Sequence, residues 1–326
     1  MNHLLEKIMA AETFSSQEAK DFIYSIDEEK LNSETIAAIL VGIQIRGIQL
    51  QELVGFRSAL LELCNPIELD SSNAIDLCGT GGDGKNTFNI STTSSLILAA
   101  MGKKVIKHGN YGVSSTCGSS NVLEELGFVF SSKNEDLTNA LSRQNICFLH
   151  APLFHPTMKK VAPIRKALGV RTIFNALGPL VNPAQPAYQL TGTYNLELAR
   201  IYQHVLKNER NDFRVVYGMD GYDEITLTDN TRSIGKYSDE IVNAESFGQS
   251  KLKQADLFAG NTTQDAAKLL TSVLKGNGTN AQNAVVAANV ASALQILHPN
   301  ENLPNSFNEA LSFIKSGQGS KHFKLN

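Results

Sequence analysis

The feature that most constrains the fold of this chain is a change of sequence pattern near Ser71 and Ser72. Before this point, apolar residues recur three and four positions apart, as in the stretch 36–43, which is the spacing of amphipathic helices. After it, short β-rich segments alternate with helical segments, a pattern typical of a largely parallel sheet covered by helices. We therefore expect an α/β protein with a small all-helical N-terminal domain, residues 1–66, and a larger α/β domain, residues 72–326, with a mainly parallel central sheet.

Individual residues predict where the elements begin and end. Ser15 and Glu18 fit a capping box at a helix start, Gly47 is typical of a helix end, and Asn65-Pro66 breaks the last helix of the first domain. The strands that we expect in the second domain are 74–78, 104–107, 146–150, 188–194, 213–218 and 231–237. The helices that we expect there are 91–101, 121–126, 135–144, 157–168, 196–208, 264–274 and 281–297.

Composition and charge limit the partners and the compartment that we expect. The 326 residues carry a formal net charge of -3, so there is no broad basic field with which to wrap a nucleic acid. The four cysteines show no CxxC spacing and no pairing with nearby histidines, which argues against zinc and against a disulfide framework. Acidic Glu6 and Glu12 do not fit a signal peptide, and no apolar run approaches the roughly 20 residues of a membrane span. We expect a cytoplasmic protein without nucleic-acid or membrane partners.

The most informative stretch for function is the glycine-rich segment 76–92, DLCGTGGDGKNTFNIST, which runs from a predicted strand into a helix start. Its glycines let a ligand approach the backbone, and N–H groups at the following helix start favour phosphate. The hydroxyls of Thr87, Ser91 and Thr92 add hydrogen-bond donors. The segment is neither GxGxxG nor GxxxxGK[ST], so it only weakly indicates a dinucleotide or Walker site. A plain glycine turn is the alternative, and the length of the run disfavours it.

A second polar loop follows the next predicted strand, over residues 107–120, KHGNYGVSSTCGSS. The ligand crevice of an open α/β sheet lies at the carboxyl ends of its strands, so both loops can hold one ligand from two sides. Lys107 offers a positive charge for phosphate, and Ser115 and Ser119 offer neutral donors. His108 would serve as an acid, a base or an aromatic wall, and by itself it is more often structural.

Taken together, the motifs GTGGDG, NIST, KHGN with its following serine pair, and FNALGPLVNPA resemble those of the anthranilate phosphoribosyltransferases. The resemblance runs from the helical start to beyond residue 230, in the family's order. It implies a nucleoside phosphorylase/phosphoribosyltransferase-like fold. It also implies transfer of the 5-phosphoribosyl group of phosphoribosyl pyrophosphate (PRPP) to the amine of anthranilate, with release of pyrophosphate, in tryptophan biosynthesis. The same resemblance implies two magnesium ions and a homodimer assembled through the helical domain.

The resemblance also implies the site residues. It assigns no covalent or obligatory acid–base residue. It places anthranilate at Gly79, Asn110 and Arg165, and magnesium at Ser91, Asp223 and Glu224. It surrounds PRPP with Gly79, Gly82, Asp83, Thr87, Asn89, Ile90, Ser91, Thr92, Lys107, His108, Gly109, Asn110, Ser114, Ser115 and Ser119.

The chemistry of two of these assignments is sound in itself. A planar guanidinium at Arg165 can meet the anthranilate carboxylate at two points, although an isolated arginine on a helix is usually solvated. Magnesium prefers hard oxygen ligands and commonly uses one or two carboxylates with substrate phosphate, as Asp223 and Glu224 would provide. An isolated acidic pair is usually a solvated turn, but the two loops before it favour the metal.

Three residues depart from the simplest interpretation. Many family members have arginine after KHGN, whereas this chain has Tyr111, so one cationic contact to PRPP is absent. His150 and His155 are five positions apart, which fits one helix face less well than three or four, so a packed histidine is expected at 150.

The alternatives to the main interpretation are a pyrimidine nucleoside phosphorylase-like enzyme and a noncatalytic relative that binds nucleic acid.

Overall fold

The computed structural model describes residues 2–112 and 117–323, and the chain divides into two compact units. The helical unit contains Met1–Ile67 and Ala151–Pro183, and the α/β unit contains Glu68–His150 and Ala184–Asn326. The helical unit therefore differs from the predicted first domain, because it also includes the segment 151–183. Helix α9 of this segment, Pro156–Leu168, packs against helices α2 and α3, and Thr157 donates a hydrogen bond to Asp27 at 2.8 Å.

The helical unit begins and ends its helices at residues that the sequence marks. Ser15 and Glu18 form the predicted capping box at the start of α2, and Gly47 ends α3 with a φ of 85°. A buried carboxylate, Glu52, accepts hydrogen bonds from the Phe14 N–H at 2.8 Å and from Arg46 at 2.6 Å. The elements, besides α9, are α1 (Asn2–Met9), α2 (Ser16–Asp27), α3 (Ser33–Arg46), α4 (Leu50–Glu62), α8 (Ala151–Phe154), α10 (Ile173–Leu177) and the 3-10 helix η1 (Gly178–Leu180).

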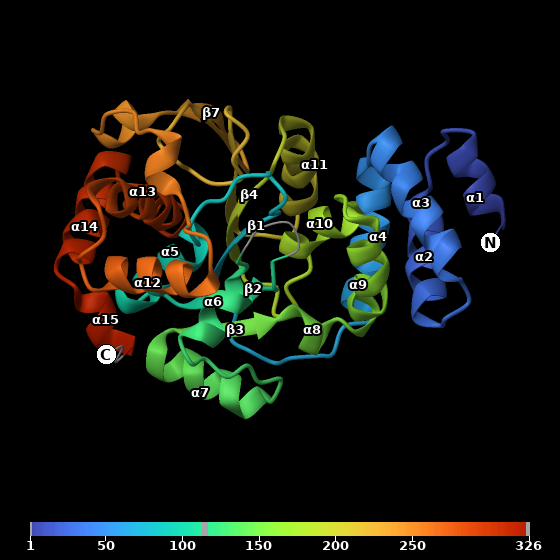
Figure 1. Cartoon of the computed structure of the whole chain (residues 1–326), viewed down its shortest axis with the longest axis horizontal. Helices are drawn as coiled ribbons and strands as arrows, with labels where there is room; N and C mark the ends of the chain where they lie inside the picture. Colours follow the sequence, from blue (N-terminus) through green and yellow to red (C-terminus); the bar gives the residue numbers. More distant parts are fainter. Residues whose placement is uncertain (1, 113–116, 324–326) are drawn as a thin grey trace. The chain divides into compact units, whose positions relative to one another are not determined.

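A seven-stranded sheet in the order β3-β2-β1-β4-β5-β6-β7 forms the centre of the α/β unit (Figure 1). Strands β1 to β5 run parallel, and β6 and β7 are antiparallel, so the predicted mainly parallel sheet is confirmed. The strand bounds are β1 Ile75–Gly79, β2 Val105–Gly109, β3 Ile146–His150, β4 Tyr188–Gly192, β5 Asp212–Gly218, β6 Thr231–Gly235 and β7 Asp239–Val242. Every predicted strand is present, and β7 is the addition.

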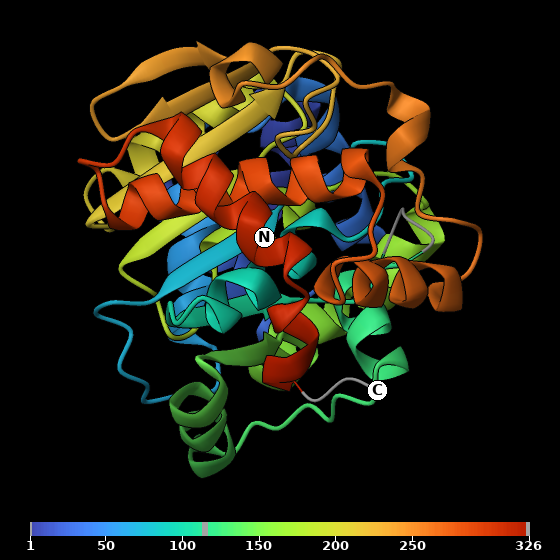
Figure 2. The same cartoon turned by 90° about the vertical axis from the view of Figure 1, so that its left-hand side faces the viewer.

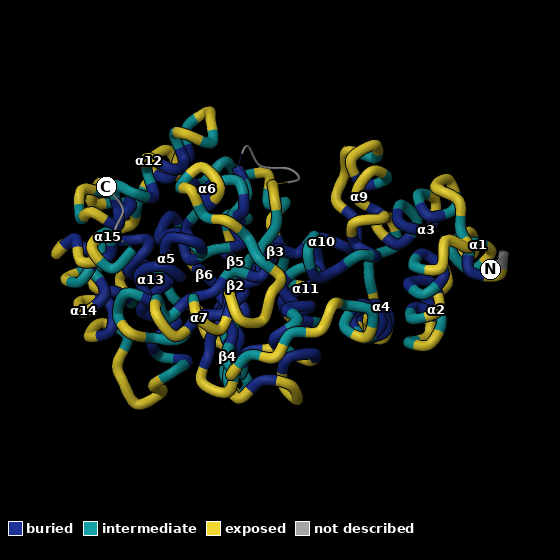
Figure 3. The backbone as a smooth tube through the Cα atoms, turned by 90° about the horizontal axis from the view of Figure 1, so that it is seen from below, coloured by how far each residue is buried: buried dark blue, intermediate teal, exposed yellow. Residues whose placement is uncertain are grey.

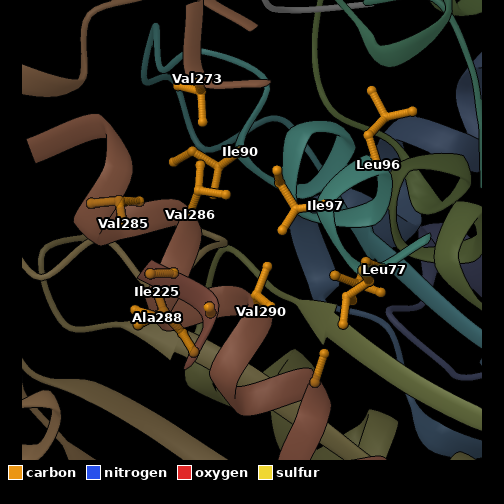
Figure 4. Packing of buried hydrophobic residues seen from close by; sticks show 14 of the residues in the cluster. Leu77, Ile90, Leu96, Ile97, Ile225, Val273, Val285, Val286, Ala288 and Val290 are labelled. Carbon is orange, nitrogen blue, oxygen red and sulfur yellow. The ribbon is translucent and has the colours of Figure 1, made fainter. Parts of the chain in front are cut away.

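Helices cover the sheet and supply most of the core of this unit. Helix α13 is buried along most of its length, and Figure 3 shows it in dark blue, whereas α7 is largely exposed. The close view in Figure 4 shows Val286 and Val290 of α13 packed near Ile97 of α5 and Leu77 of β1. Figure 2 shows α13 and α14 side by side in orange and red. The helices are α5 (Ile90–Ala100), α6 (Ser119–Glu125), α7 (Asn134–Gln144), α11 (Leu196–Leu206), α12 (Thr263–Leu274), α13 (Asn280–Leu297), α14 (Leu303–Lys315) and α15 (Gln318–Phe323), with 3-10 helices η2 (Ala244–Phe247) and η3 (Gln254–Leu257).

Helix length and composition bear on the membrane expectation. Among residues 2–112 and 117–323, no helix combines the length and the apolar character that crossing a bilayer requires.

Candidate active site

The two predicted polar loops lie next to each other at one edge of the sheet. They follow the carboxyl ends of β1 and β2, which are neighbours in the sheet. A hydrogen bond joins them directly, because the Asn89 side-chain amide donates to the Cys117 carbonyl at 3.1 Å. Gly81, Gly82 and Gly84 have φ values of 61°, 75° and 74°, which are left-handed conformations that glycine adopts without steric cost. The described parts of the two loops are therefore in contact, and their shared ligand stays a prediction.

The loop after β5 reaches the glycine-rich turn through a gap between two glycines. The Gly81 N–H donates to Asp223 Oδ2 at 2.6 Å. A Cβ at Gly79 would lie 2.4 Å from the same oxygen, and one at Gly192 would lie 1.6 Å from the Asp223 carbonyl oxygen. Any larger side chain at either position would displace Asp223. These glycines therefore let an acidic residue approach the phosphate-binding turn that the sequence predicts.

The second acidic residue of this loop lies at the start of α5. Glu224 Oε1 accepts a hydrogen bond from the Ser91 N–H at 3.2 Å. Buried Asn289 of α13 fixes the backbone just beyond it, since its amide donates to the Ile225 carbonyl at 2.8 Å. The structure thus brings together Ser91, Asp223 and Glu224, the set that the sequence predicts for magnesium.

Electrostatics at this set favour a bound cation. Burial, together with the charge of nearby Asp83, raises the pKa of Asp223 above that of an ordinary carboxyl group. Burial, together with the charge of Asp223, likewise raises the pKa of Glu224. Among the described residues, no three His, Cys, Asp or Glu side chains form a ligand cluster by themselves. The two carboxylates and the Ser91 hydroxyl are hard oxygen donors, and they fit a Mg²⁺ ion that takes its other ligands from water and phosphate.

Lys107 and His108, which the sequence prediction includes in the second loop, belong to strand β2. Both are buried, and the Lys107 ammonium donates to the Leu77 carbonyl of the neighbouring strand. The positive charge of Lys107 acts on Glu224 and lowers its pKa against the effect of burial. The His108 N–H donates to Asp76 at 3.3 Å. Lys107 therefore lies within electrostatic range of Glu224, in the strand that leads into the second loop.

Residues 86–88, which follow the glycines of the turn, pair with the segment 257–259, which the sequence did not predict as part of the site. Thr87 pairs with Phe258 in an isolated antiparallel bridge. The Phe88 N–H donates to the Leu257 carbonyl at 3.1 Å, and the Ala259 N–H donates to the Asn86 carbonyl at 3.0 Å. This pairing fixes the chain that leads into Asn89 and Ile90 at the start of α5.

The second loop is pinned at its base to the start of α6. The Asn110 carbonyl accepts hydrogen bonds from the Ser119 hydroxyl and the Ser120 N–H, both at 3.2 Å. Gly109 allows this closeness, because a Cβ there would lie 2.4 Å from Ser119 Oγ. The predicted residues Ser114 and Ser115 lie outside the described residues.

Arg165 belongs to the helical unit, where α9 carries it, and it is buried. Its guanidinium donates to Asn175 Oδ1 at 3.3 Å and lies over the Phe174 ring, 5.7 Å from the centroid. Burial lowers the pKa of Arg165 to about 10, so the side chain remains positively charged at neutral pH. Arg165 is therefore a buried side chain and not the solvated surface arginine of the alternative interpretation.

The two histidines that suggested a metal pair are packed separately. His150 ends β3 in the α/β unit and lies 2.8 Å from the Ser120 hydroxyl through Nδ1. His155 belongs to the helical unit, where its Nε2 lies 2.7 Å from the Val181 carbonyl. The expectation of a packed histidine at 150 is confirmed.

Three residues of the site were not predicted from the sequence, and each lacked a motif. Gly192 is a single glycine at a strand end, Asn289 lies in an apolar helix, and Phe258 lies in an irregular segment. Of these three residues, Asn289 was indicated by the sequence. It is a polar residue at the centre of the mostly apolar run 284–296, and a buried amide needs hydrogen-bond partners.

Family models and the fold define the class of this protein. The model described as "Glycosyl transferase family, a/b domain" matches residues 71–320. The model described as "Glycosyl transferase family, helical bundle domain" matches residues 2–64. A helical unit, a mainly parallel α/β unit and a glycine-rich turn beside an acidic pair agree with these matches. The class is therefore that of glycosyl transferases with a helical bundle and an α/β domain.

Individual relatives narrow the family further. The anthranilate phosphoribosyltransferase of Christiangramia forsetii is 50% identical, and the match covers 99% of this chain and 98% of that protein. The corresponding enzyme of Flavobacterium psychrophilum is 48% identical, with 99% and 98% covered. The chain belongs to the anthranilate phosphoribosyltransferase family.

Solved structures agree with this assignment. The crystal structure of anthranilate phosphoribosyltransferase from Thermus thermophilus has a TM-score of 0.90 at 29% identity, with 98% of this chain and 97% of that chain covered. The enzyme from Saccharomyces cerevisiae in complex with PRPP and Mg has a TM-score of 0.89 at 24% identity, with 99% and 95% covered, and it shares the fold.

Proposed function

We propose that this chain transfers the 5-phosphoribosyl group of PRPP to the amine of anthranilate and releases pyrophosphate, as a step of tryptophan biosynthesis. The observation that carries the proposal is the contact between the glycine-rich turn and the acidic loop, in which the Gly81 N–H donates to Asp223 at 2.6 Å. A phosphate-binding turn beside two desolvated carboxylates suits a ligand that is a metal-bound pyrophosphate. The near full-length relatives carry the name of this activity.

The turn and the acidic pair would share the work of stabilising pyrophosphate. Magnesium, held by Ser91, Asp223 and Glu224, would neutralise the negative charge that develops on the leaving group. The positive end of the α5 helix dipole would act on the same oxygens. The positive charge of Lys107 already acts on Glu224, and it would offset part of the negative charge of the acidic pair.

The PRPP site follows the two loops. We assign PRPP, the phosphoribosyl donor, to residues on or beside these loops, and we retain Ser114 and Ser115, which lie outside the described residues, from the resemblance. The proposed PRPP residues are Gly79, Gly82, Asp83, Thr87, Asn89, Ile90, Ser91, Thr92, Lys107, His108, Gly109, Asn110, Ser114, Ser115 and Ser119.

Anthranilate would be recognised by its carboxylate and positioned by its amine. Arg165 of the helical unit offers a buried guanidinium that contacts two uncharged residues, Asn175 and Phe174. A carboxylate would supply the opposite charge at two points. The resemblance also assigns Asn110 and Gly79, which belong to the α/β unit, to anthranilate.

The chemistry needs positioning more than it needs a covalent intermediate. The amine nitrogen attacks the anomeric carbon of the ribose, the bond from that carbon to the pyrophosphate oxygen breaks, and the configuration inverts. The amine proton passes to solvent, and the electron pair leaves with pyrophosphate. Burial raises the pKa of the Cys78 thiol, next to the turn, to about 12, so this group does not supply a thiolate nucleophile at neutral pH.

The test is to follow the loss of anthranilate fluorescence in mixtures of the protein, magnesium, PRPP and anthranilate, leaving out each component in turn. The proposal expects loss of fluorescence only when all four are present. A parallel reaction with a pyrimidine nucleoside and inorganic phosphate examines the phosphorylase alternative. Release of free base in that reaction, without consumption of anthranilate, would overturn the proposal.

Assembly, metal number and compartment complete the proposal. We infer a homodimer formed through the helical domain, where Met9 and Ile45 are 81% and 83% exposed and Val54 is 40% exposed. Two magnesium ions per site follow the family resemblance. A cytoplasmic location is consistent with the four free thiols Cys64, Cys78, Cys117 and Cys147. Sedimentation and metal titration of the protein test the first two points.

A further inference from the structure

Tyr111, the residue after Asn110 in the second loop, has two partners for its side chain on neighbouring elements. Its hydroxyl donates to Glu124 Oε1 on α6 at 2.7 Å. Its ring meets the His150 ring edge-on, with the centroids 4.7 Å apart and the planes at 77°. The side chain is therefore fixed at its polar tip by a helix and along its ring by the end of β3, although it is 40% exposed.

His150 links Tyr111 to Ser120 at the base of the loop. Its Nδ1 lies 2.8 Å from the Ser120 hydroxyl, and Phe130 stacks on its face with ring centroids 4.6 Å apart. His150 is buried and is the register partner of Gly109, the last residue of β2. The imidazole is thus held on its face by an aromatic ring and on its edge by a serine, so that Tyr111 rests on a rigid support.

Ser120 also contacts Asn110. The Ser120 N–H donates to the Asn110 carbonyl at 3.2 Å. The Tyr111 N–H donates to the Asn110 side-chain oxygen at 2.8 Å. Asn110, Tyr111, His150 and Ser120 therefore form a closed ring of contacts. This ring sets both the backbone and the amide orientation of Asn110.

We propose that Tyr111 is a positioning residue, which uses Glu124 and His150 to hold Asn110 in the orientation that substrate binding requires. The inference rests on the proposed function, in which Asn110 contacts PRPP and anthranilate. Tyr111 acts through Asn110 and not on the reacting atoms, so its loss changes substrate affinity more than turnover. This role rests on the hydroxyl and the ring of Tyr111, and it requires no positive charge.

The kinetic test removes the contact of the Tyr111 hydroxyl and leaves the ring in place. Tyr111→Phe keeps the ring on His150 and removes the hydrogen bond, and Glu124→Ala removes the acceptor. Each variant should raise the KM for anthranilate about 3- to 10-fold, with kcat changed less than about twofold. The double variant should raise KM no further than the single variants do, because both remove the same bond. Tyr237→Phe is the matched control, since Tyr237 is 86% exposed and far along the chain.

A second measurement does not depend on the reaction. Amide hydrogen exchange in peptides that cover residues 105–112 and 117–125 should be faster in Tyr111→Phe than in the parent, and unchanged in Tyr237→Phe. A parent protein without transferase activity would refute the proposed function, and exchange would still report whether Tyr111 holds the loop. Parent-like KM in Tyr111→Phe, with or without faster exchange, would overturn the positioning role.

Discussion

Gly79 and Gly192 are register partners on the parallel strands β1 and β4, and both lie against Asp223. Their missing side chains leave the space in which the acidic loop meets the glycine-rich turn. Asp223 fills this space with its carboxylate on the Gly79 side and its carbonyl on the Gly192 side. The position of the proposed metal ligand is therefore set by two strand ends as well as by its own loop.

Replacement of Gly192 should damage the acidic pair without touching a substrate. In Gly192→Ala the new Cβ would begin 1.6 Å from the Asp223 carbonyl oxygen, so the loop must move. A displacement on the order of 1 Å costs about 100-fold in turnover where reacting groups are held in place. We expect that loss in kcat together with a higher magnesium requirement.

The control for this substitution is Gly178→Ala, because a Cβ at Gly178 would meet no atom within 4 Å. Kinetics at varied magnesium and a melting curve are measured for both variants. Parent-like magnesium dependence in a folded Gly192→Ala protein would show that the strand-end glycines do not control the acidic loop.

Local pattern was sufficient to predict much of the fold, and it failed where tertiary contacts decide. The six predicted strands each contain at least three buried residues, whereas β7 is an exposed edge strand with the sequence DEIV. Helix α14 was not predicted, although Phe307, Ala310 and Ile314 lie three and four positions apart, which is the spacing of an amphipathic helix. The segment 151–183 joined the helical unit through packing with α2 and α3, which no local pattern encodes.

The site shows the same division. The glycine-rich turn and the second loop are continuous motifs, so their proximity followed from strand order. Asn289 and Phe258 act on the site from segments about 200 and 170 positions away from Asn89, so their part depends on the folded arrangement. Sequence spacing alone contains no measure of such contacts.

The acidic pair should act through the metal and not through proton transfer. Asp223→Asn and Glu224→Gln remove negative charge that burial already disfavours, so the variants should fold while binding magnesium less tightly. We expect the magnesium concentration for half-maximal rate to rise at least about 10-fold in the double variant. Glu240→Gln, an exposed carboxylate on β7, serves as the control. The metal assignment fails if the double variant keeps the parent's magnesium dependence and turnover.

His155 should make the helical unit sensitive to acid. Burial lowers the pKa of His155 from 6.5 to about 4, so the unfolded chain binds a proton more readily than the folded one. The stabilising contribution is therefore complete above about pH 6.5 and is lost as pH falls towards about 4, to a total of about 3 kcal/mol. Urea unfolding across this range should show a steeper loss of stability for the parent than for His155→Gln. Equal slopes for the two proteins would contradict the assignment.

Arg165 should affect the binding of anthranilate and not that of PRPP, because its proposed partner is the anthranilate carboxylate. Arg165→Ala removes a charge-assisted contact of roughly 1.5–3 kcal/mol, which corresponds to about 10- to 150-fold in the KM for anthranilate. Arg165→Lys should restore only part of the binding, since lysine lacks the planar fork that spans two carboxylate oxygens. Lys166→Ala, which removes an exposed charge from the next position of α9, is the matched control. Steady-state kinetics at varied anthranilate and varied PRPP, with a melting curve for each variant, make the measurement. A higher KM for PRPP with unchanged anthranilate saturation would assign the guanidinium to the phosphate donor instead.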